Sequence, residues 1–357
     1  MKSHNLFCLA LLCCFSNSIW ATPYTTYTIT DLGKQDTNSI QTSDTNNFGQ
    51  TTGWYTTATT IVNSMGMTVP TYHAFINNNG VVRDIGTLGG NYSAGKSINN
   101  SGQVTGNSTT TGNAAVHAFF YSNEIMSDLG TLGGSYSYGE GINDSSKITG
   151  YSAITGNASH HAFIYTNGVM TDIGTLGGNN SIGRSLNNNG HVAGFSATSA
   201  NGPNHAFLYR DGVMVDLGTL GGSISGSYDI NNAGQVVGSS QLTGTPVSIS
   251  PYDIHAFLYT EGVMVDLNNL IPQNSGWSLT EAFTINDMGQ ITGYGILRSS
   301  AGLNWHNFLL NPIRETSIPE PDSYSLIGVG LSILAQRCHK SRRHARITSK
   351  KNRNKRK

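Results

Sequence analysis

The chain has 357 residues, and its 20 Lys plus Arg balance its 20 Asp plus Glu. The balance conceals an uneven distribution, because residues 22–316 hold 8 Lys plus Arg against 18 Asp plus Glu, a net charge of −10. A body this acidic excludes nucleic acid and anionic membrane surfaces as partners. All four cysteines lie outside residues 22–316, so the body forms no disulfide, and its stability must come from a large packed core.

The N-terminal segment, residues 1–21, has the pattern of a secretory signal peptide. Lys2 precedes an apolar run from Leu6 to Phe15, and Ala21 is a small residue suited to cleavage. The pattern predicts export and removal of this segment, so fold arguments begin at residue 22.

Six near-copies of one unit fill residues 27–311. Each combines a His-Ala-Phe segment, an Asp-Leu-Gly or Asp-Ile-Gly segment, an Ile-Asn turn and a Gly-Gln-Val-x-Gly segment, with departures in several copies, most of all in the first and the last. The histidines are His73, His117, His161, His205, His255 and His306. The aspartates are Asp31, Asp84, Asp128, Asp172, Asp216 and Asp266. From Asp84 to Asp216 the spacing is 44 residues, a period typical of a four-stranded propeller blade.

Within each unit the pattern predicts short strands joined by tight turns. In residues 161–174 aromatic and β-branched runs flank Asn167-Gly168, which is a hairpin signal. No helical pattern occurs in the body. We therefore predict an all-β fold, a six-bladed β-propeller of four-stranded blades over residues 22–316, with a β-solenoid as the alternative.

The two ends of the repeat region complement each other. The first copy begins with a lone strand from Tyr27 to Leu32, and the last copy lacks the Asp-Leu strand that should follow His306. The N-terminal strand is therefore predicted to complete the last blade, which hides both sheet edges.

The repeated His and Asp residues suggest a metal ring or a catalytic pair, but a catalytic site needs one special constellation, whereas these residues recur once per unit. We expect the histidines and aspartates to satisfy buried polar groups, which makes them structural. The clearest of these residues are His117, Asp128, His161, Asp172, His205 and Asp216. No catalytic residue, metal site or cofactor is predicted, and the Thr-Leu-Gly-Gly segments lack the Lys-Ser/Thr of a phosphate-binding loop.

Binding is expected where the units differ. The connections before His73, His255 and His306 are the longest, and they carry the predicted ligand-binding residues. These residues are Trp54, Tyr55, Tyr252 and Trp305. The leading hypothesis is a non-catalytic surface or matrix protein that binds polysaccharide or a protein partner through one face.

Two other classes of function stay open. One is an adhesive spacer without a discrete ligand. The other is a secreted glycan-active hydrolase or lyase, which would have to rely on isolated acids such as Asp229, Asp253 and Glu281.

The C-terminal region has three parts: residues 317–322 with Pro319, Glu320 and Pro321, an apolar stretch over residues 323–335, and a basic tail over residues 336–357. This order resembles the PEP-CTERM sorting signal of Gram-negative bacteria that produce exopolysaccharide. The resemblance implies processing by an exosortase at the Pro-Glu-Pro motif after transient anchoring in the inner membrane, and release to the cell surface or medium. The apolar stretch is shorter than a full membrane span, so a partial signal would leave the protein anchored. The basic tail is then a topology signal and not a nucleic-acid-binding arm.

The repeat itself also resembles a known family. Met-x-Asp-Leu-Gly-Thr-Leu-Gly-Gly, Ile-Asn-Asn-x-Gly-Gln-Val and His-Ala-Phe-Leu-Tyr are similar to HAF-type extracellular repeats, over residues 27–311. This resemblance implies an extracellular or cell-surface protein without a defined activity.

Overall fold

The computed structural model describes residues 26–33, 40–62, 65–243, 253–299 and 302–313. These residues are all-β, as predicted, and contain no α-helix. The predicted signal peptide, the Pro-Glu-Pro motif and the basic tail lie outside the described residues. Contacts divide the chain into Met1–Ile313 and Arg314–Lys357, and every described residue belongs to the first of these.

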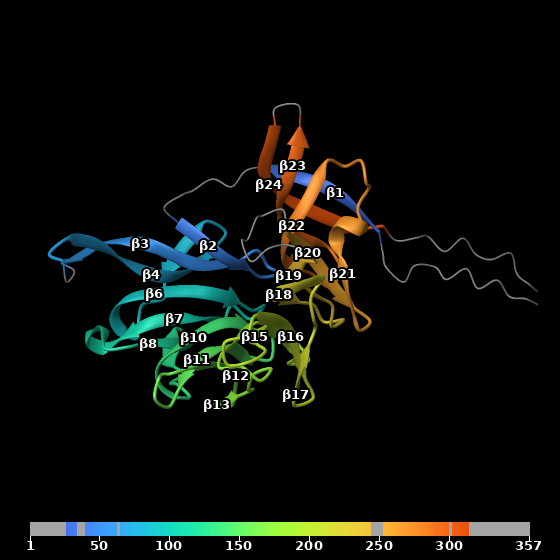
Figure 1. Ribbon diagram of the computed structural model, residues 1–357. Coiled ribbons are helices and arrows are strands. Elements are labelled where there is room, and N and C mark those ends of the chain that lie inside the picture. The colour runs from blue at the N-terminus through green and yellow to red at the C-terminus, as the bar shows by residue number, and fades with distance from the viewer. Residues whose placement is uncertain (1–25, 34–39, 63–64, 244–252, 300–301, 314–357) are drawn as a thin grey trace, which may run out of the picture. The chain divides into compact units, whose positions relative to one another are not determined.

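The strands group into six units of four, named here in chain order (Figure 1). Unit 1 comprises β2 (Ile40–Thr45), β3 (Thr51–Val62), β4 (Thr68–Asn78) and β5 (Val81–Asp84). Unit 2 comprises β6 (Gly89–Ile98), β7 (Val104–Thr110), β8 (Val116–Ser122) and β9 (Ile125–Asp128), with the 3-10 helix η1 (Thr111–Asn113). Unit 3 comprises β10 (Gly133–Ile142), β11 (Ile148–Ile154), β12 (His160–Thr166) and β13 (Val169–Asp172).

The remaining units follow the same plan. Unit 4 comprises β14 (Ser181–Leu186), β15 (Val192–Ala197), β16 (Asn204–Arg210) and β17 (Val213–Asp216). Unit 5 comprises β18 (Gly221–Ile230), β19 (Val236–Leu242), β20 (Ile254–Thr260) and β21 (Val263–Asp266), followed by the 3-10 helix η3 (Leu267–Asn269). Unit 6 comprises β22 (Trp277–Ile285), β23 (Ile291–Ser299), β24 (Gly302–Pro312) and β1 (Tyr27–Gly33).

Antiparallel hairpins build each unit. In unit 3, β12 and β13 pair through the predicted Asn167-Gly168 turn, where both residues have positive φ, 51° and 83°. Two consecutive positive φ values are what a two-residue hairpin turn with the right-handed strand twist requires. The sequence signal at this turn therefore had a direct conformational cause.

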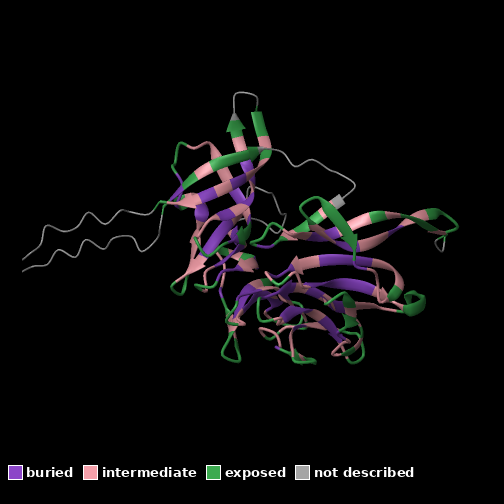
Figure 2. Ribbon diagram, turned by 180° about the vertical axis from the view of Figure 1, so that it is seen from behind, coloured by how far each residue is buried: buried purple, intermediate pink, exposed green. Residues whose placement is uncertain are grey.

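The hydrophobic core lies between units. The phenylalanine of every His-Ala-Phe or His-Asn-Phe segment is fully buried, and Figure 2 shows buried segments along the strands with exposed residues gathered at the turns. These residues are Phe75, Phe119, Phe163, Phe207, Phe257 and Phe308. Phe207 of unit 4, for example, packs with Ala162 and Ile173 of unit 3. Each such ring contributes about 2–3 kcal/mol by burial, so neighbouring units depend on one another.

In units 2 to 5 a serine of the first strand fastens the unit to the one before it. Ser181 Oγ accepts the Ala162 N–H at 2.8 Å and donates to the Gly174 carbonyl at 2.5 Å. The passage between the units needs glycine, because Gly177 has φ of +112° and a Cβ on Gly178 would lie 2.4 Å from a side chain of the adjacent strand. The same serine contacts recur at Ser93, Ser137 and Ser225.

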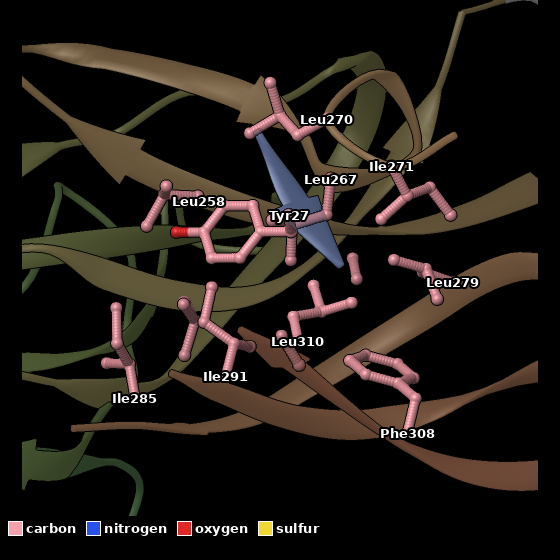
Figure 3. Close-up of a cluster of buried hydrophobic side chains, with 13 residues drawn as sticks. Tyr27, Leu258, Leu267, Leu270, Ile271, Leu279, Ile285, Ile291, Phe308 and Leu310 are labelled. Atoms are coloured by element: carbon pink, nitrogen blue, oxygen red, sulfur yellow. The ribbon is translucent and has the colours of Figure 1, made fainter. Parts of the chain in front are cut away.

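The N-terminal strand completes the last unit. β1 pairs antiparallel with β24, from Tyr27 opposite Pro312 to Asp31 opposite Phe308. Figure 3 shows Tyr27 among the apolar side chains of units 5 and 6, and only 2% of this residue is exposed. Burial raises the pKa of Tyr27 to about 12. This tyrosine anchors the first strand in the core of the last two units.

The described strands form four sheets, and none of these closes on itself. Single parallel pairings, Tyr72 with Tyr92 and Val116 with Tyr136, join units 1 to 3 into one 12-stranded sheet. Units 4, 5 and 6 are four-stranded sheets.

Candidate functional site

The repeated His and Asp residues lie side by side in every unit. The Nδ1 atom of each histidine is 2.6–2.9 Å from a carboxylate oxygen of its aspartate. In unit 3, for example, Asp172 contacts His161 through Oδ2 and accepts the Gly174 N–H through Oδ1. The pairs thus hold the outer hairpin and the turn that follows it. Among the described residues, no three His, Cys, Asp or Glu side chains are grouped so as to hold a metal ion.

The first strands of all six units line one polar depression of about 280 Å³. Asn99 Nδ2 donates to the Asn143 carbonyl at 3.0 Å, and Asn143 Nδ2 donates to the Asn187 carbonyl at 2.9 Å. Equivalent bonds link units 1 and 2, units 4 and 5, and units 5 and 6. Because each side-chain amide donates to the main-chain carbonyl of the asparagine in the next unit, the main role of these residues is to hold the first strands together.

Four carboxylates line this depression, and two of them, Asp44 and Asp229, have a raised pKa. Asp44 accepts a hydrogen bond from Ser97 Oγ at 2.8 Å, and Asp229 accepts one from Ser185 Oγ at 2.6 Å. Burial raises the pKa of both, that of Asp229 to about 6, although the hydrogen bonds that each accepts act in the opposite direction. Their oxygens are thus already occupied by protein donors.

The units differ most at one cross-strand pair between their first and second strands. The second member is always the residue directly after the conserved glycine of the second strand. The pairs, from unit 1 to unit 6, are Gln41–Trp54, Ala94–Asn107, Tyr138–Tyr151, Ile182–Phe195, Gly226–Ser239 and Glu281–Tyr294. We call this position the variable pair.

In unit 3 the variable pair is a stack of two tyrosines. The rings of Tyr138 and Tyr151 are 4.9 Å apart and nearly parallel, at 11°. Tyr136 and His160 flank the stack on either side. Aromatic side chains therefore fill this position completely.

In unit 5 the same position is open. Gly226 stands where unit 3 has Tyr138, and Ser239 stands where unit 3 has Tyr151. The result is a cavity of about 240 Å³ walled by Phe195, Tyr228 and Ile224. The lining also includes Asn204, Ser239, Gln241, Ile254 and Glu281. We call it the unit-5 cavity.

Glu281, from the variable pair of unit 6, brings a carboxylate to this apolar space. Burial raises the pKa of Glu281, and no hydrogen bond or ion pair to its carboxylate is found among the described residues. Glu281 and Tyr228 line the same cavity; burial raises the pKa of the Tyr228 phenol, and the charge of Glu281 adds to this effect. The site thus combines aromatic walls with one carboxylate that no other side chain neutralises.

Beyond Glu281 the aromatic surface continues. Tyr294 is the cross-strand partner of Glu281, and directly opposed residues in a sheet have Cβ atoms about 5 Å apart. Trp305 stacks on Tyr294 at 5.0 Å and 12°, and 36% of Trp305 is exposed. Glu281 thus lines the unit-5 cavity and is also the cross-strand neighbour of the Tyr294–Trp305 stack. We refer to these three parts together as the Glu281 groove.

Of the aromatics predicted to bind ligand, Trp305 alone among the described residues belongs to the Glu281 groove. Trp54 packs edge-on against Tyr72 in unit 1, at 5.0 Å. Tyr55 contacts Phe75 and donates its hydroxyl to Asp84 Oδ2 at 2.9 Å, so it serves the His–Asp pair of unit 1. Tyr252 lies outside the described residues.

The comparisons with known proteins give one family. Residues 177–308 match a family described as a protein of unknown function, DUF3466, and this range includes the whole lining of the unit-5 cavity and the Glu281 groove. No curated protein matches. Among solved structures, the chain is similar to a putative TolB from Agrobacterium tumefaciens, with 12% identity and a TM-score of 0.40 over 61% of this chain and 88% of that chain. Within the described part of the chain, no helix is long and apolar enough to cross a membrane.

Proposed function

We propose that this protein is an exported, non-catalytic six-bladed β-propeller that binds polysaccharide in the Glu281 groove. The single observation that carries the binding proposal is the groove itself. It joins the unit-5 cavity to an exposed tyrosine–tryptophan stack through one carboxylate.

The propeller architecture is supported by three features of the units. There are six, each four-stranded, and equivalent residues of all six first strands line the same polar depression. The last unit is completed by the strand from the other end of the chain. A radial arrangement accounts for all three, whereas a solenoid gives its first and last units no common depression and no reason to exchange a strand.

Polysaccharide is the ligand class that fits the groove best. Sugar rings present flat apolar C–H faces with hydroxyls at the edge, so they stack on exposed aromatic side chains and bond to polar groups around them. Trp305 offers such a face, and Ser239 and Gln241 offer polar atoms at the cavity.

The proposed cellular location is based on the two ends of the sequence. The signal peptide of residues 1–21 and the PEP-CTERM-like ending of residues 317–357 support export, and the motif Pro319 to Pro321 supports processing by an exosortase. Bacteria with that sorting system make exopolysaccharide, so a polysaccharide ligand and a biofilm matrix location are consistent with each other.

The first experiment is sedimentation of purified residues 22–316 with the producing strain's extracellular polysaccharide, over a range of concentrations. We expect saturable binding that an unrelated acidic propeller does not show, and a polymer of unchanged size. No binding would sink the proposal, and a shortened polymer would favour a hydrolase or lyase.

Two variants locate the site in the same assay. Trp305→Ala should weaken binding by about 2 kcal/mol, roughly thirtyfold, because it removes a central aromatic contact. Trp54→Ala is the matched control, since Trp54 packs on Tyr72 outside the groove. Equal losses in the two variants would remove the groove assignment.

A further inference from the structure

We infer that the Glu281 groove selects a glycan residue that carries a free amine, with Glu281 as the counter-ion of the ammonium group. This inference rests on the proposed function and narrows it from polysaccharide in general to amino sugars that are not acetylated.

The Glu281 carboxylate is half-buried and lines the unit-5 cavity. A carboxylate held half-buried beside aromatic rings loses hydration, and this loss is offset only by a cation or by hydrogen-bond donors. Neither engages Glu281 among the described residues, and it still faces the cavity. A ligand ammonium would supply the missing cation.

Arg184, the cation next to the wall of the cavity, already forms an ion pair with another acid. Arg184 forms an ion pair with Glu140 at 3.1 Å and lies over the ring of Phe195, 5.4 Å from its centroid. The contrast between the two acids is informative, because Glu140 has its own arginine and Glu281 has none. The unit-5 cavity is therefore equipped with a negative charge that the fold itself does not use.

The walls favour the same ligand. Phe195 and Tyr228 present aromatic rings to the cavity, and aromatic faces attract ammonium groups as well as the apolar face of a sugar. An N-acetyl group would remove the positive charge, and a uronic acid would be repelled by Glu281. The acidic body, with 8 Lys plus Arg against 18 Asp plus Glu in residues 22–316, adds long-range attraction for a cationic polymer.

The test is calorimetric titration of the full chain with three oligosaccharides of equal length and linkage, built from glucosamine, N-acetylglucosamine or glucose. The measurement is made slightly below neutral pH, where the amine is protonated. We expect the glucosamine oligomer to bind at least about tenfold more tightly than the other two. Equal affinity for all three would overturn the inference and leave the proposed function intact, whereas failure of the chain to bind any glycan, the native polymer included, would refute both.

Variants connect the preference to the residues. Glu281→Gln should erase the preference for the amine, whereas Glu261→Gln, which removes the same charge from the exposed β20–β21 turn, should keep it. Retention of the preference in Glu281→Gln would overturn the inference.

A second variant closes the cavity without removing any charge. Gly226→Tyr places the tyrosine of unit 3 at the equivalent register position, and a Cβ there meets nothing closer than 3.6 Å. We expect this variant to fold with unchanged stability and to lose binding of the amine oligomer. Full binding by a folded Gly226→Tyr protein would show that the unit-5 cavity is not the site.

Discussion

Units 3 and 5 bury a phenylalanine at the same register position, yet the variable pair is filled in unit 3 and open in unit 5. Phe163 and Phe257 are both fully buried. At the variable pair, however, the Tyr138–Tyr151 stack of unit 3 is replaced in unit 5 by Gly226 and Ser239. The comparison shows that the repeat holds its fold with residues outside the variable pair, which leaves that pair free to change without altering the backbone.

The largest expected effect tests whether the two units share one skeleton. Phe163→Ala and Phe257→Ala should each lower the free energy of unfolding by about 3–5 kcal/mol, because each leaves a cavity in a fully packed core. The measurement is urea denaturation, with Val169→Ala at the exposed start of β13 as the control. A much smaller loss for Phe257 would break the equivalence of the units.

A second difference between the units is a charge. Unit 5 has Asp229 where unit 3 has Gly141, and burial raises the pKa of Asp229 from 3.8 to about 6. An acid whose pKa is raised on folding binds its proton more tightly in the native state, so stability falls as pH rises between these two values. The loss amounts to at most about 3 kcal/mol, because solvent in the depression screens the charge.

The check is the unfolding free energy of the wild type and of Asp229→Asn across that pH window. The variant should lose most of the pH-dependent decline. An unchanged slope would assign the decline to other groups, among which Asp44, with its raised pKa, stands in the same depression.

Tyr151→Ser sharpens the comparison from the other side, because it gives unit 3 the residue found in unit 5. We expect a loss of about 1–2 kcal/mol in thermal or chemical unfolding, from the missing aromatic stack. The variant should not gain affinity for amine-bearing oligosaccharides, since Ile182 stands in the next unit where Glu281 follows unit 5. A gain of binding would mean that an open variable pair suffices without the carboxylate.

The smallest expected effect concerns the His–Asp pairs. His161→Gln should cost less than about 1 kcal/mol, because Asp172 is 40% exposed and a surface pair is screened by water. His255→Gln should cost more, because Asp266 is only 14% exposed in its pair. Equal losses in chemical denaturation would show that burial does not set the strength of these pairs.

The all-β fold and its hairpins were largely predictable because their signals are local. Asn167-Gly168 specifies a turn by backbone conformation alone. The last copy of the repeat has no Asp-Leu strand after His306, which left a place for the strand that begins at Tyr27. The all-β fold follows from these elements and from the repeat period.

The candidate site was less predictable, because it is defined by two small residues that leave space where other units carry large side chains. Gly226 and Ser239 carry no signal of their own, and they become informative only when the units are aligned on the glycine of the second strand. Glu281 stood out in the sequence as an isolated acid, but its aromatic surroundings come from three different units.

Trp54 and Tyr55 illustrate the same limit at the level of one strand. They were grouped because both were assigned to the longest connection, the one before His73, whereas the structure places both in β3. Successive side chains of a strand point to opposite faces, so Trp54 meets Tyr72 while Tyr55 meets the His–Asp pair.

The pairing of β1 with β24 also constrains when the protein can finish folding. Tyr27 finds its partner only after residue 312 is available, and until then unit 6 has an exposed strand edge and an incomplete core. A contact between residues this distant in sequence slows folding, because a long loop must close first. If the chain is exported as proposed above, this delay would keep the polypeptide unfolded while it crosses the membrane. β24 would cross after β1, and the pairing of the two strands would complete the fold outside.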